Sequence, residues 1–344
     1  MNKIIKNKCS LVGFLFCFFA ASVCSSSTLS DMANTLVKKA GNGSVVEGTE
    51  GWLFLKEELI HMGSDKFWGE DAAAVSRSRK KQYADPLPAI LAYNKLLAEK
   101  GITLYLMPVP PKGLIYFDKL GFEVDTDVST EQVAMYEEFY TLLRTAGVKV
   151  IDLLPALLAK REESDVYCRT DTHFSAAGIN LFAEAAAAVI KQAEWYSGSV
   201  QKEYVLSPRT LSIQGDLALM AELQNQGESI ELSFVTVKDS GQSEVSDPAS
   251  PVILLGDSHT LVFSAGGDLH AKGAGLFDHL SARLGFPVDL LGVRGSGVTP
   301  ARIKLFQRSK KDGDYLKGKK AVIWCFAARD FTGSGGWREI PVAP

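Results

Sequence analysis

An alternation of apolar and amphipathic segments is the feature of this 344-residue sequence that most limits its fold. Five runs of strand length are almost wholly apolar, and they cover residues 102–109, 148–153, 252–256, 288–293 and 321–327. Segments with helical periodicity alternate with them, at residues 75–100, 130–146, 176–192, 275–284 and 302–309. Continuous apolar runs of this kind are typical of parallel strands whose two faces are both covered by helices. The sequence therefore predicts an α/β fold with three layers and a central parallel sheet.

The first 24 residues have the layout of a secretory signal peptide. A basic start is followed by the apolar run 11–21 and by small residues, and the run is short for a membrane span. Export of the mature chain is expected; a lipoprotein attached at Cys24 and an uncleaved membrane anchor are the alternatives. Outside this leader the sequence has two cysteines, Cys168 and Cys325. Export would permit a disulfide between them, but two separate buried thiols fit the sequence at least as well.

The rest of the chain, residues 25–344, is predicted to form one domain. Its length, and the hydrophobic content of 46% in the full sequence, allow a large core. Residues 197–248 interrupt the alternation with a polar stretch rich in Ser, Gln and Glu, which predicts a smaller inserted lobe beside the site. The formal net charge of -3 is mild, so charge gives no indication of nucleic-acid binding.

A serine follows one of the predicted strands, in the sequence Gly256-Asp-Ser-His. Ser258 would therefore lie on a sharp turn, with its hydroxyl exposed and its N–H able to face a developing oxyanion. A serine hydroxyl is a good nucleophile only when a base removes its proton. Helix capping by Asp257 or Ser258 is the simpler explanation of the same motif.

An aspartate and a histidine two residues apart could supply that base. In a turn, Asp171 can hold the Nδ1–H of His173 and leave Nε2 free to accept the serine proton. Alternatively, Asp171 caps the following helix and His173 lies on the surface. A metal site with His173, Asp171 and His259 as ligands is a further alternative, although convincingly spaced additional ligands are missing. The remaining three histidines are predicted to be helix or surface residues: His61, His270 and His279.

Further polar residues could line a binding pocket. A backbone N–H at Gly295 or Gly297 could be a second oxyanion donor, although a plain turn explains these glycines equally well. Arg329 ends the last strand and could bind an oxyanion or an acidic sugar, or pair with Asp330 or another carboxylate. His259 could contribute to substrate binding, although a side chain next to the nucleophile normally points away.

These polar motifs are predicted to meet at one edge of the sheet. Three of them follow strands, and the ligands of such sheets bind at the carboxyl ends of the strands. A fourth, Asp171-Thr-His, lies in the loop before the helix at 176–192. We therefore predict one site that four separate loops form together.

In this combination and order, the motifs resemble those of the SGNH-type acyltransferases of bacterial exopolysaccharide modification, the alginate O-acetyltransferase AlgX/AlgJ-like family. The resemblance covers roughly residues 45–335 and rests on Gly51-Trp-Leu-Phe-Leu, Pro108-Val-Pro-Pro-Lys-Gly-Leu-Ile-Tyr, Tyr167-Cys-Arg-Thr-Asp-Thr-His-Phe with Gly178, Leu255-Gly-Asp-Ser-His and Val322-Ile-Trp-Cys-Phe-Ala-Ala-Arg. Ordinary SGNH esterases have the serine motif first, whereas here the Asp/His pair precedes it. The resemblance thus implies an SGNH-hydrolase-like fold with a circularly permuted motif order. Two departures are Phe174, where relatives usually have Trp, and the lack of a carbohydrate-binding module after the last strand.

The resemblance implies a periplasmic O-acetyltransferase. Ser258 would be the nucleophile, His173 the base and Asp171 the group that orients it, while Arg329 and the Gly295 loop would line the pocket. The acceptor would be an alginate-like exopolysaccharide. A membrane-bound protein would supply the acetyl groups, because the periplasm lacks soluble acetyl-CoA. We expect no cofactor and no catalytic metal.

Two other functions fit the same residues. An acetylesterase would use the same triad and pass the acetyl group to water instead of a sugar. A catalytically silent polysaccharide-binding or assembly subunit would keep the fold without turnover. The basic segment 294–320 could attract a uronic-acid polymer, or it could be a solvated helix and turn.

Overall fold

The structure, a computed structural model, describes residues 28–122, 130–198, 201–224, 226–295 and 297–344. The predicted signal peptide, residues 1–24, lies outside these ranges. Within them, no helix combines the length and the apolar character that crossing a membrane requires.

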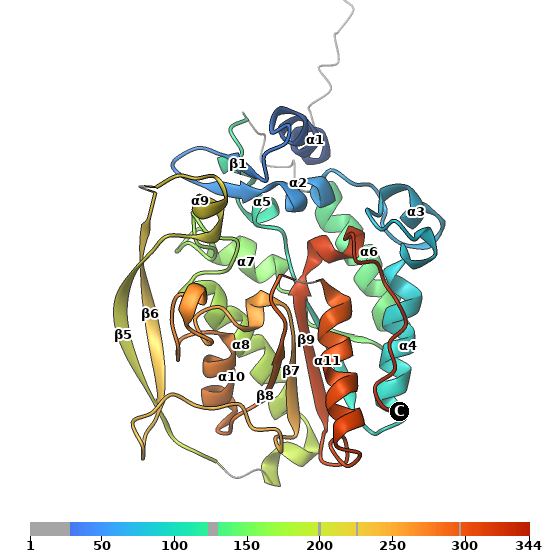
Figure 1. The fold of residues 1–344 in the computed structure, drawn as a ribbon, viewed down its shortest axis with the longest axis vertical. Helices are drawn as coiled ribbons and strands as arrows, with labels where there is room; N and C mark the ends of the chain where they lie inside the picture. Colours follow the sequence, from blue (N-terminus) through green and yellow to red (C-terminus); the bar gives the residue numbers. More distant parts are fainter. Residues whose placement is uncertain (1–27, 123–129, 199–200, 225, 296) are drawn as a thin grey trace, which may run out of the picture.

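The predicted strands form one parallel sheet, with the order β4–β3–β9–β7–β8 (Figure 1). Their bounds are β3 (Thr103–Val109), β4 (Lys149–Val150), β7 (Val252–Gly256), β8 (Asp289–Gly292) and β9 (Ala321–Ala327). The last strand of the chain, β9, lies in the middle of the sheet between β3 and β7. Every residue of β7 and β9 is buried, as expected for central strands covered on both faces.

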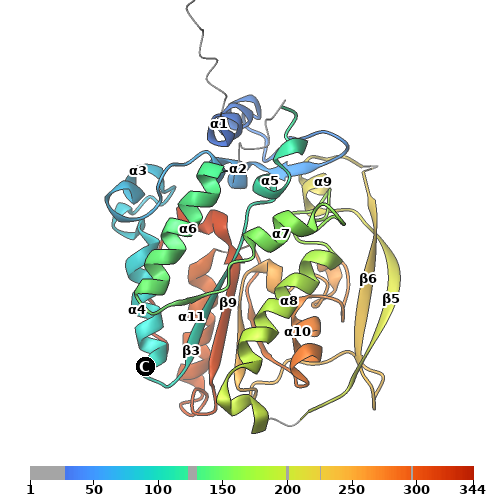
Figure 2. The same cartoon turned by 180° about the vertical axis from the view of Figure 1, so that it is seen from behind.

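Helices cover both faces of this sheet, which confirms the predicted three-layer α/β fold (Figures 1 and 2). One layer contains α4 (Pro86–Ala98), α6 (Thr130–Thr145) and α11 (Val298–Lys311). The other contains α7 (Leu154–Lys160), α8 (Ala176–Lys191) and α10 (Leu276–Leu284). The small buried alanines of α8 allow it to pack closely against α10.

Helix α4 begins later than the periodicity over residues 75–100 predicts. The carboxylate of Asp85 accepts the Leu87 N–H at 2.9 Å, and Pro86 occupies the first helical position. Proline lacks an N–H and has a fixed φ, which suits the first turn of a helix, and it disfavours helical geometry in the residue before it. The chain before Asp85 therefore forms a short helix, α3 (Ala72–Val75), and turns.

A long two-stranded antiparallel ribbon lies outside α8 and α10 (Figure 1). It consists of β5 (Tyr204–Ile213) and β6 (Glu228–Val237), which α9 (Asp216–Met220) connects. These elements fall within the polar segment 197–248, where the sequence predicts an inserted lobe. Through α9, this segment reaches the end of the sheet at which the strands terminate.

The N-terminal elements lie over the carboxyl ends of the strands (Figure 1). They are α1 (Leu29–Lys39), β1 (Val45–Glu47), β2 (Leu53–Leu55), α2 (Lys56–Met62) and, further along the chain, α5 (Lys112–Ile115). Residues of α2 form part of the wall of the cavity at this edge of the sheet.

Both cysteines outside the predicted signal peptide are buried free thiols. Of the two alternatives, separate thiols rather than a disulfide therefore describe Cys168 and Cys325 in this structure. Burial raises the pKa of each thiol well above its ordinary value, so neither has the thiolate character of a nucleophile.

Candidate active site

A glycine and an aspartate set the position of Ser258 after β7. At Gly256, a Cβ atom would lie 1.9 Å from the carbonyl oxygen of Cys325 on β9, so only glycine lets the chain pass so close. Asp257 then accepts the N–H of His259 at 2.9 Å and caps a short 3-10 turn, Ser258–Thr260. Capping by Asp257 is thus compatible with a reactive Ser258, because the cap fixes the turn on which the serine lies.

Ser258, His173 and Asp171 form a continuous chain of hydrogen bonds. The Oγ of Ser258 lies 2.8 Å from Nε2 of His173, and Nδ1 of His173 lies 2.6 Å from Oδ1 of Asp171. An ionised carboxylate only accepts hydrogen bonds, so Nδ1 carries a proton and Nε2 can accept the proton of the serine. The structure therefore brings together the three residues that the sequence predicts as nucleophile, base and orienting group.

Burial and mutual attraction both act on the charges of this pair. Burial alone would raise the pKa of Asp171, but His173, together with hydrogen bonds from His173, His270 and the Asp216 N–H, holds that pKa well below its ordinary value. Burial alone would lower the pKa of His173, but the neighbouring Asp171 raises it above its ordinary value. Asp171 therefore stays ionised and makes His173 a stronger base.

The carboxylate of Asp171 accepts four hydrogen bonds. Oδ1 accepts the backbone N–H of His173 at 3.0 Å in addition to its Nδ1–H. Oδ2 accepts the N–H of Asp216, at the start of α9, and Nε2–H of His270, each at 2.9 Å. The prediction that His270 is a helix or surface residue is therefore wrong. It lies in the loop between β7 and α10, at the end of the 3-10 turn Gly267–Leu269, and its only sequence signal is that it is a histidine in the stretch that follows Ser258.

The other two histidines of that prediction are also buried. His61 in α2 bonds through its ring to Thr332 and Tyr136, and burial, more than the nearby arginines, lowers its pKa to about 3. His279 in α10 bonds to the carbonyl oxygen of Ser233, and burial is the main cause that lowers its pKa to about 4. Both are helix residues, as predicted, but neither lies on the surface.

A buried lysine and a glutamate hold the loop that carries Asp171. Nζ of Lys112 donates to the carbonyl oxygens of Arg169 and Asp171, each at 2.9 Å. Burial is the main cause that lowers the pKa of Lys112 to about 8. From β6, Glu228 accepts the N–H groups of Arg169 and Thr170 at 2.8 and 2.7 Å. Sequence reasoning missed both residues, because each reaches the loop from more than 50 positions away.

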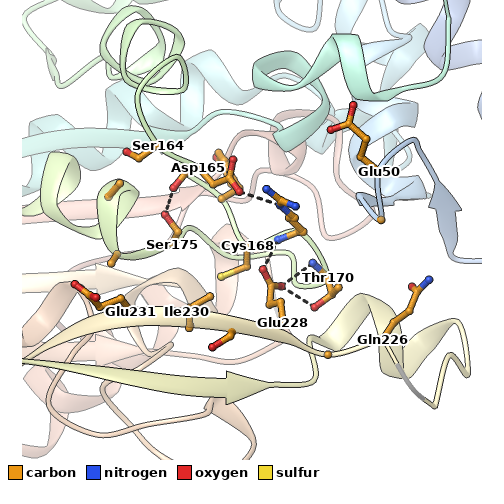
Figure 3. Close-up of a pocket in the computed structure, with 17 residues that line it drawn as sticks. Glu50, Ser164, Asp165, Cys168, Thr170, Ser175, Gln226, Glu228, Ile230 and Glu231 are labelled. Atoms are coloured by element: carbon orange, nitrogen blue, oxygen red, sulfur yellow. Dashed lines mark hydrogen bonds and ion pairs between the residues drawn. The ribbon is translucent and has the colours of Figure 1, made fainter.

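A second cavity of about 740 Å³ lies on the outer side of this loop (Figure 3). Its wall contains Glu228 and the backbone segment that Glu228 binds, together with Asp165, which pairs with Arg169 at 2.9 Å. Ser258 and His173 do not line this cavity. The second cavity is therefore separate from the hydrogen-bonded serine.

The predicted meeting of four loops is confirmed by the cavity around Ser258. This cavity has a volume of about 810 Å³, and its wall includes Asp171, His173, Ser258, Gly295, Gly297 and Arg329. The residues come from the loop before α8, the turn after β7, the turn before α11 and the end of β9. As predicted for such a sheet, the site lies at the carboxyl edge of the strands.

Arg329 reaches the cavity, but one of its nitrogens is already bound. Nη1 donates to Oε1 of Glu58 at 2.7 Å, so the alternative of pairing with a structural carboxylate holds for this nitrogen. Although burial opposes it, attraction by Glu58, Asp330 and Asp257 raises the pKa of Arg329 above its ordinary value. The adjacent Asp330 also lines the cavity, and burial is the main cause that raises its pKa to about 7.

The prediction that His259 binds substrate does not agree with its position. His259 is fully buried and does not line the cavity. Its Nδ1 lies 3.0 Å from Oδ1 of Asp257, and its ring packs edge-on against that of His173, with 4.8 Å between the centroids. As expected for a neighbour of Ser258, its side chain points inward, where it supports the ring of His173.

The alternative metal site with His173, Asp171 and His259 as ligands is not formed, because the ring of His259 turns toward Asp257. Among the described residues, Asp171, His173 and Asp216 do offer ligand atoms within 4.8 Å of one another. However, Asp216 already accepts the N–H and Oγ1–H of Thr172 at 2.7 and 2.6 Å, and both oxygens of Asp171 are bound. A metal would have to break the hydrogen bonds that shape the site.

The basic segment 294–320 does not form a rim around this cavity. Arg302 is buried against aromatic rings, and Arg308 and Lys319 both bind Asp289. Within the described residues, Arg294 is the basic residue of this segment that lines the cavity, and it pairs with an exposed aspartate. Of the two alternatives for this segment, the basic rim is therefore not formed, since most of these charges have structural partners or lie away from the site.

The fold and the hydrogen-bonded serine, histidine and aspartate define a protein of the SGNH-hydrolase type. A family model described as the SGNH hydrolase-like domain of the acetyltransferase AlgX matches residues 45–328. The chain belongs to this family, as the sequence motifs predict.

Curated relatives and solved structures agree with this assignment. A probable alginate O-acetylase AlgJ of Pseudomonas syringae pv. tomato is 26% identical over 218 residues, which is 63% of this chain and 50% of the relative. The probable alginate O-acetylase AlgJ of Pseudomonas putida is 25% identical over 232 residues, which is 64% of this chain and 56% of the relative. The chain thus spans about half the length of the curated relatives that it matches.

Two solved structures share the fold. The O-acetyltransferase domain of Pseudomonas putida AlgJ superimposes with a TM-score of 0.61 at 22% identity, over 84% of this chain and 92% of that domain. Pseudomonas aeruginosa AlgX superimposes with a TM-score of 0.59 at 19% identity, over 84% of this chain and 63% of AlgX. These likenesses confirm the SGNH-hydrolase-like architecture of the chain.

Proposed function

We propose that this protein is a periplasmic O-acetyltransferase that transfers acetyl groups to the hydroxyls of an alginate-like exopolysaccharide. The observation that carries the proposal is the hydrogen-bond chain from Ser258 through His173 to Asp171 in the wall of a large open cavity. Membership of the AlgX family supports acetyl transfer as the reaction. The names of the curated AlgJ relatives support alginate as the kind of acceptor.

The reaction would take place in two displacements. Nε2 of His173 removes the proton of Ser258, and Oγ attacks the acetyl carbonyl of the donor. His173 then gives this proton to the leaving group of the donor, and an acetyl ester remains on Ser258. In the second step, His173 removes the proton of a sugar hydroxyl, which attacks the ester. The acetylated sugar leaves, and Ser258 takes back its proton from His173.

Backbone N–H groups would stabilise the oxyanion of both steps. Ser258 is the first residue of its 3-10 turn, where an N–H has no acceptor within the turn. Gly295 and Gly297 lie in the same cavity wall, at the start of α11, and an N–H of this turn is the second candidate donor. Donors fixed in this way act most strongly in a site from which water is excluded.

The acetyl donor is proposed to be a membrane-bound protein, because an exported enzyme has no access to soluble acetyl-CoA. The signal-peptide pattern of residues 1–24 supports export. No cofactor enters the proposed reaction, because the side chains of the site supply the nucleophile and the base.

Purified protein incubated with a chromogenic acetyl ester, with and without an oligouronate acceptor, would test this function. Mass spectrometry would follow the acetyl group, with Ser258→Ala as the inactive variant and Ser240→Ala, which changes an exposed serine in the turn after β6, as the matched control. Acetyl on the sugar with the wild type and Ser240→Ala, but not with Ser258→Ala, is the expected result.

Other outcomes would point to the alternative functions. Serine-dependent cleavage that leaves every offered sugar unmodified would favour the acetylesterase. No serine-dependent release of acetate would contradict the triad and favour the binding or assembly subunit.

A further inference from the structure

We propose that His270 is a positioning residue for the triad, which holds Asp171 from the side opposite His173. The inference rests on the proposed role of Ser258, His173 and Asp171, and it adds a fourth side chain to that set. His270 would not touch the reacting atoms. It would act through the carboxylate of Asp171, whose orientation and charge determine how well His173 serves as a base.

The first support is the geometry of the shared carboxylate. Nε2 of His270 lies 2.9 Å from Oδ2 of Asp171, while Nδ1 of His173 lies 2.6 Å from Oδ1. Each carboxylate oxygen therefore serves a different imidazole. Because an ionised carboxylate only accepts hydrogen bonds, Nε2 of His270 must carry a proton. This fixes the tautomer of neutral His270 as the one with a bare Nδ1.

The second support is the backbone that carries the ring. His270 has a φ of +71° and Phe263 a φ of +58°, in a region that side chains other than glycine rarely adopt. The two rings pack against each other, with 5.4 Å between the centroids. Such conformations persist only where the surrounding structure enforces them, and they concentrate at functional sites. The result here is that the turn at Gly267–Leu269, in the loop between β7 and α10, brings an imidazole onto the triad carboxylate.

The loop around this turn is closed by backbone hydrogen bonds. The Gly266 N–H donates to the carbonyl of Ala271 at 2.8 Å, and the Phe263 N–H donates to that of Leu269 at 2.9 Å. The Ala274 N–H in turn donates to the carbonyl of Phe263 at 2.9 Å. These bonds hold the loop in one conformation, so His270 has little freedom to leave Asp171.

The third support is the place of His270 in the wall of the cavity. Its side chain is 12% exposed, whereas that of Asp171 is 1% exposed. His270 thus lies in the cavity wall beside Asp171, bound to its Oδ2. Removal of the ring would both take away a donor and open the carboxylate to solvent.

The test uses two substitutions that differ in one respect. His270→Gln can place an amide N–H where Nε2 lies, whereas His270→Ala cannot donate. The readout is the rate at which a chromogenic acetyl ester acetylates Ser258, measured against pH. His279→Gln is the matched control, because His279 is also buried and bound through Nε2, to the carbonyl of Ser233, outside the cavity.

The expected result follows from the loss of a hydrogen bond to a charged group. His270→Ala should lower kcat about 10- to 100-fold with a much smaller change in KM. In the plot of its rate against pH, the fall on the acid side, the acid limb, should move to higher pH. The charge of Asp171 then acts on one imidazole instead of two, which raises the pKa of His173 further. His270→Gln should restore both the rate and the position of the limb, and His279→Gln should match the wild type.

Two results would overturn the proposal. The first is a folded His270→Ala with the rate and acid limb of the wild type, and the second is a folded His270→Gln as slow as His270→Ala. If His270→Ala does not fold, the test is the tautomer of His270 in the wild type, which the NMR signals of its imidazole nitrogens report. The Nε2–H tautomer of His270 supports the proposal, and the Nδ1–H tautomer contradicts it. Because acetylation of Ser258 needs no sugar, a failure to modify any polysaccharide would count against the proposed function alone.

Discussion

The carboxylate of Asp257 accepts the backbone N–H of Ala327 at 2.8 Å and thereby joins the turn after β7 to the end of β9. Its other oxygen accepts the N–H of His259 at 2.9 Å. Burial would raise the pKa of Asp257, but His259, Arg329 and the Ala327 N–H hold it below its ordinary value. The residue before Ser258 is therefore a fixed anion that connects two strands of the sheet.

Replacement of Asp257 should destabilise the protein through this connection. Asp257→Ala leaves two buried N–H groups without acceptors, and we expect a loss of about 2–4 kcal/mol in the free energy of unfolding. Urea denaturation followed by circular dichroism measures it. Asp268→Ala is the control, because that carboxylate is exposed and pairs with Arg294 at the surface. Equal effects of the two substitutions would show that the Asp257 connection does not stabilise the fold.

The rate of acetyl transfer should fall at low pH. Burial lowers the pKa of His173, but the neighbouring Asp171 raises it above the ordinary value of 6.5. His173 accepts the serine proton only when it is neutral, so activity is present above this pKa and is lost as the pH falls through it. A plot of kcat/KM against pH with a chromogenic acetyl ester should show an acid limb above pH 6.5. An acid limb below pH 6.5 would mean that Asp171 does not raise the pKa of His173.

Local sequence patterns predicted the sheet but not the order of its strands. An apolar run such as 321–327 shows that a strand is buried, because both of its faces need apolar side chains. It does not show that β9 lies between β3 and β7, since strand order depends on contacts between distant segments. The same holds for the β5–β6 ribbon, whose polar, exposed outer strand has no apolar run to identify it.

The same distinction between local patterns and distant contacts holds for the residues of the site. Ser258 could be predicted from the strand before it, and Asp171 and His173 from their spacing of two residues, which places both in one turn. The bond between His270 and Asp171 spans 99 positions and depends on a turn with positive φ, which no local pattern indicates. The prediction for His259 was wrong because the 3-10 turn after β7 directs this side chain toward Asp257 and into the core.

Asp171→Asn tests whether the carboxylate sets the tautomer of His173. An amide toward His173 donates instead of accepts, so it favours the tautomer in which Nε2 carries the proton and cannot take that of Ser258. In Ser-His-Asp enzymes this change lowers kcat roughly 10⁴-fold with the geometry intact, and we expect a loss of that order. Steady-state kinetics with the chromogenic ester measure it.

The control for this substitution is Asp165→Asn, which changes a partly exposed aspartate that pairs with Arg169 outside the triad. It should leave kcat close to that of the wild type. A rate for Asp171→Asn within a few fold of this control would exclude a role for the carboxylate in the base function of His173.

Glu228→Ala tests the anchor of the loop that carries Asp171. Besides two backbone N–H groups, Glu228 accepts the Oγ1–H of Thr170 at 2.6 Å, and these bonds hold the loop against β6 (Figure 3). Their loss should cost about 1–3 kcal/mol in the free energy of unfolding. Because the loop would then place Asp171 less well, kcat should fall more than KM changes. Glu231→Ala, an exposed residue of the same strand and cavity wall, should change neither quantity. If the two variants behave alike, the loop keeps its position without Glu228, and Lys112 with α9 suffices to hold it.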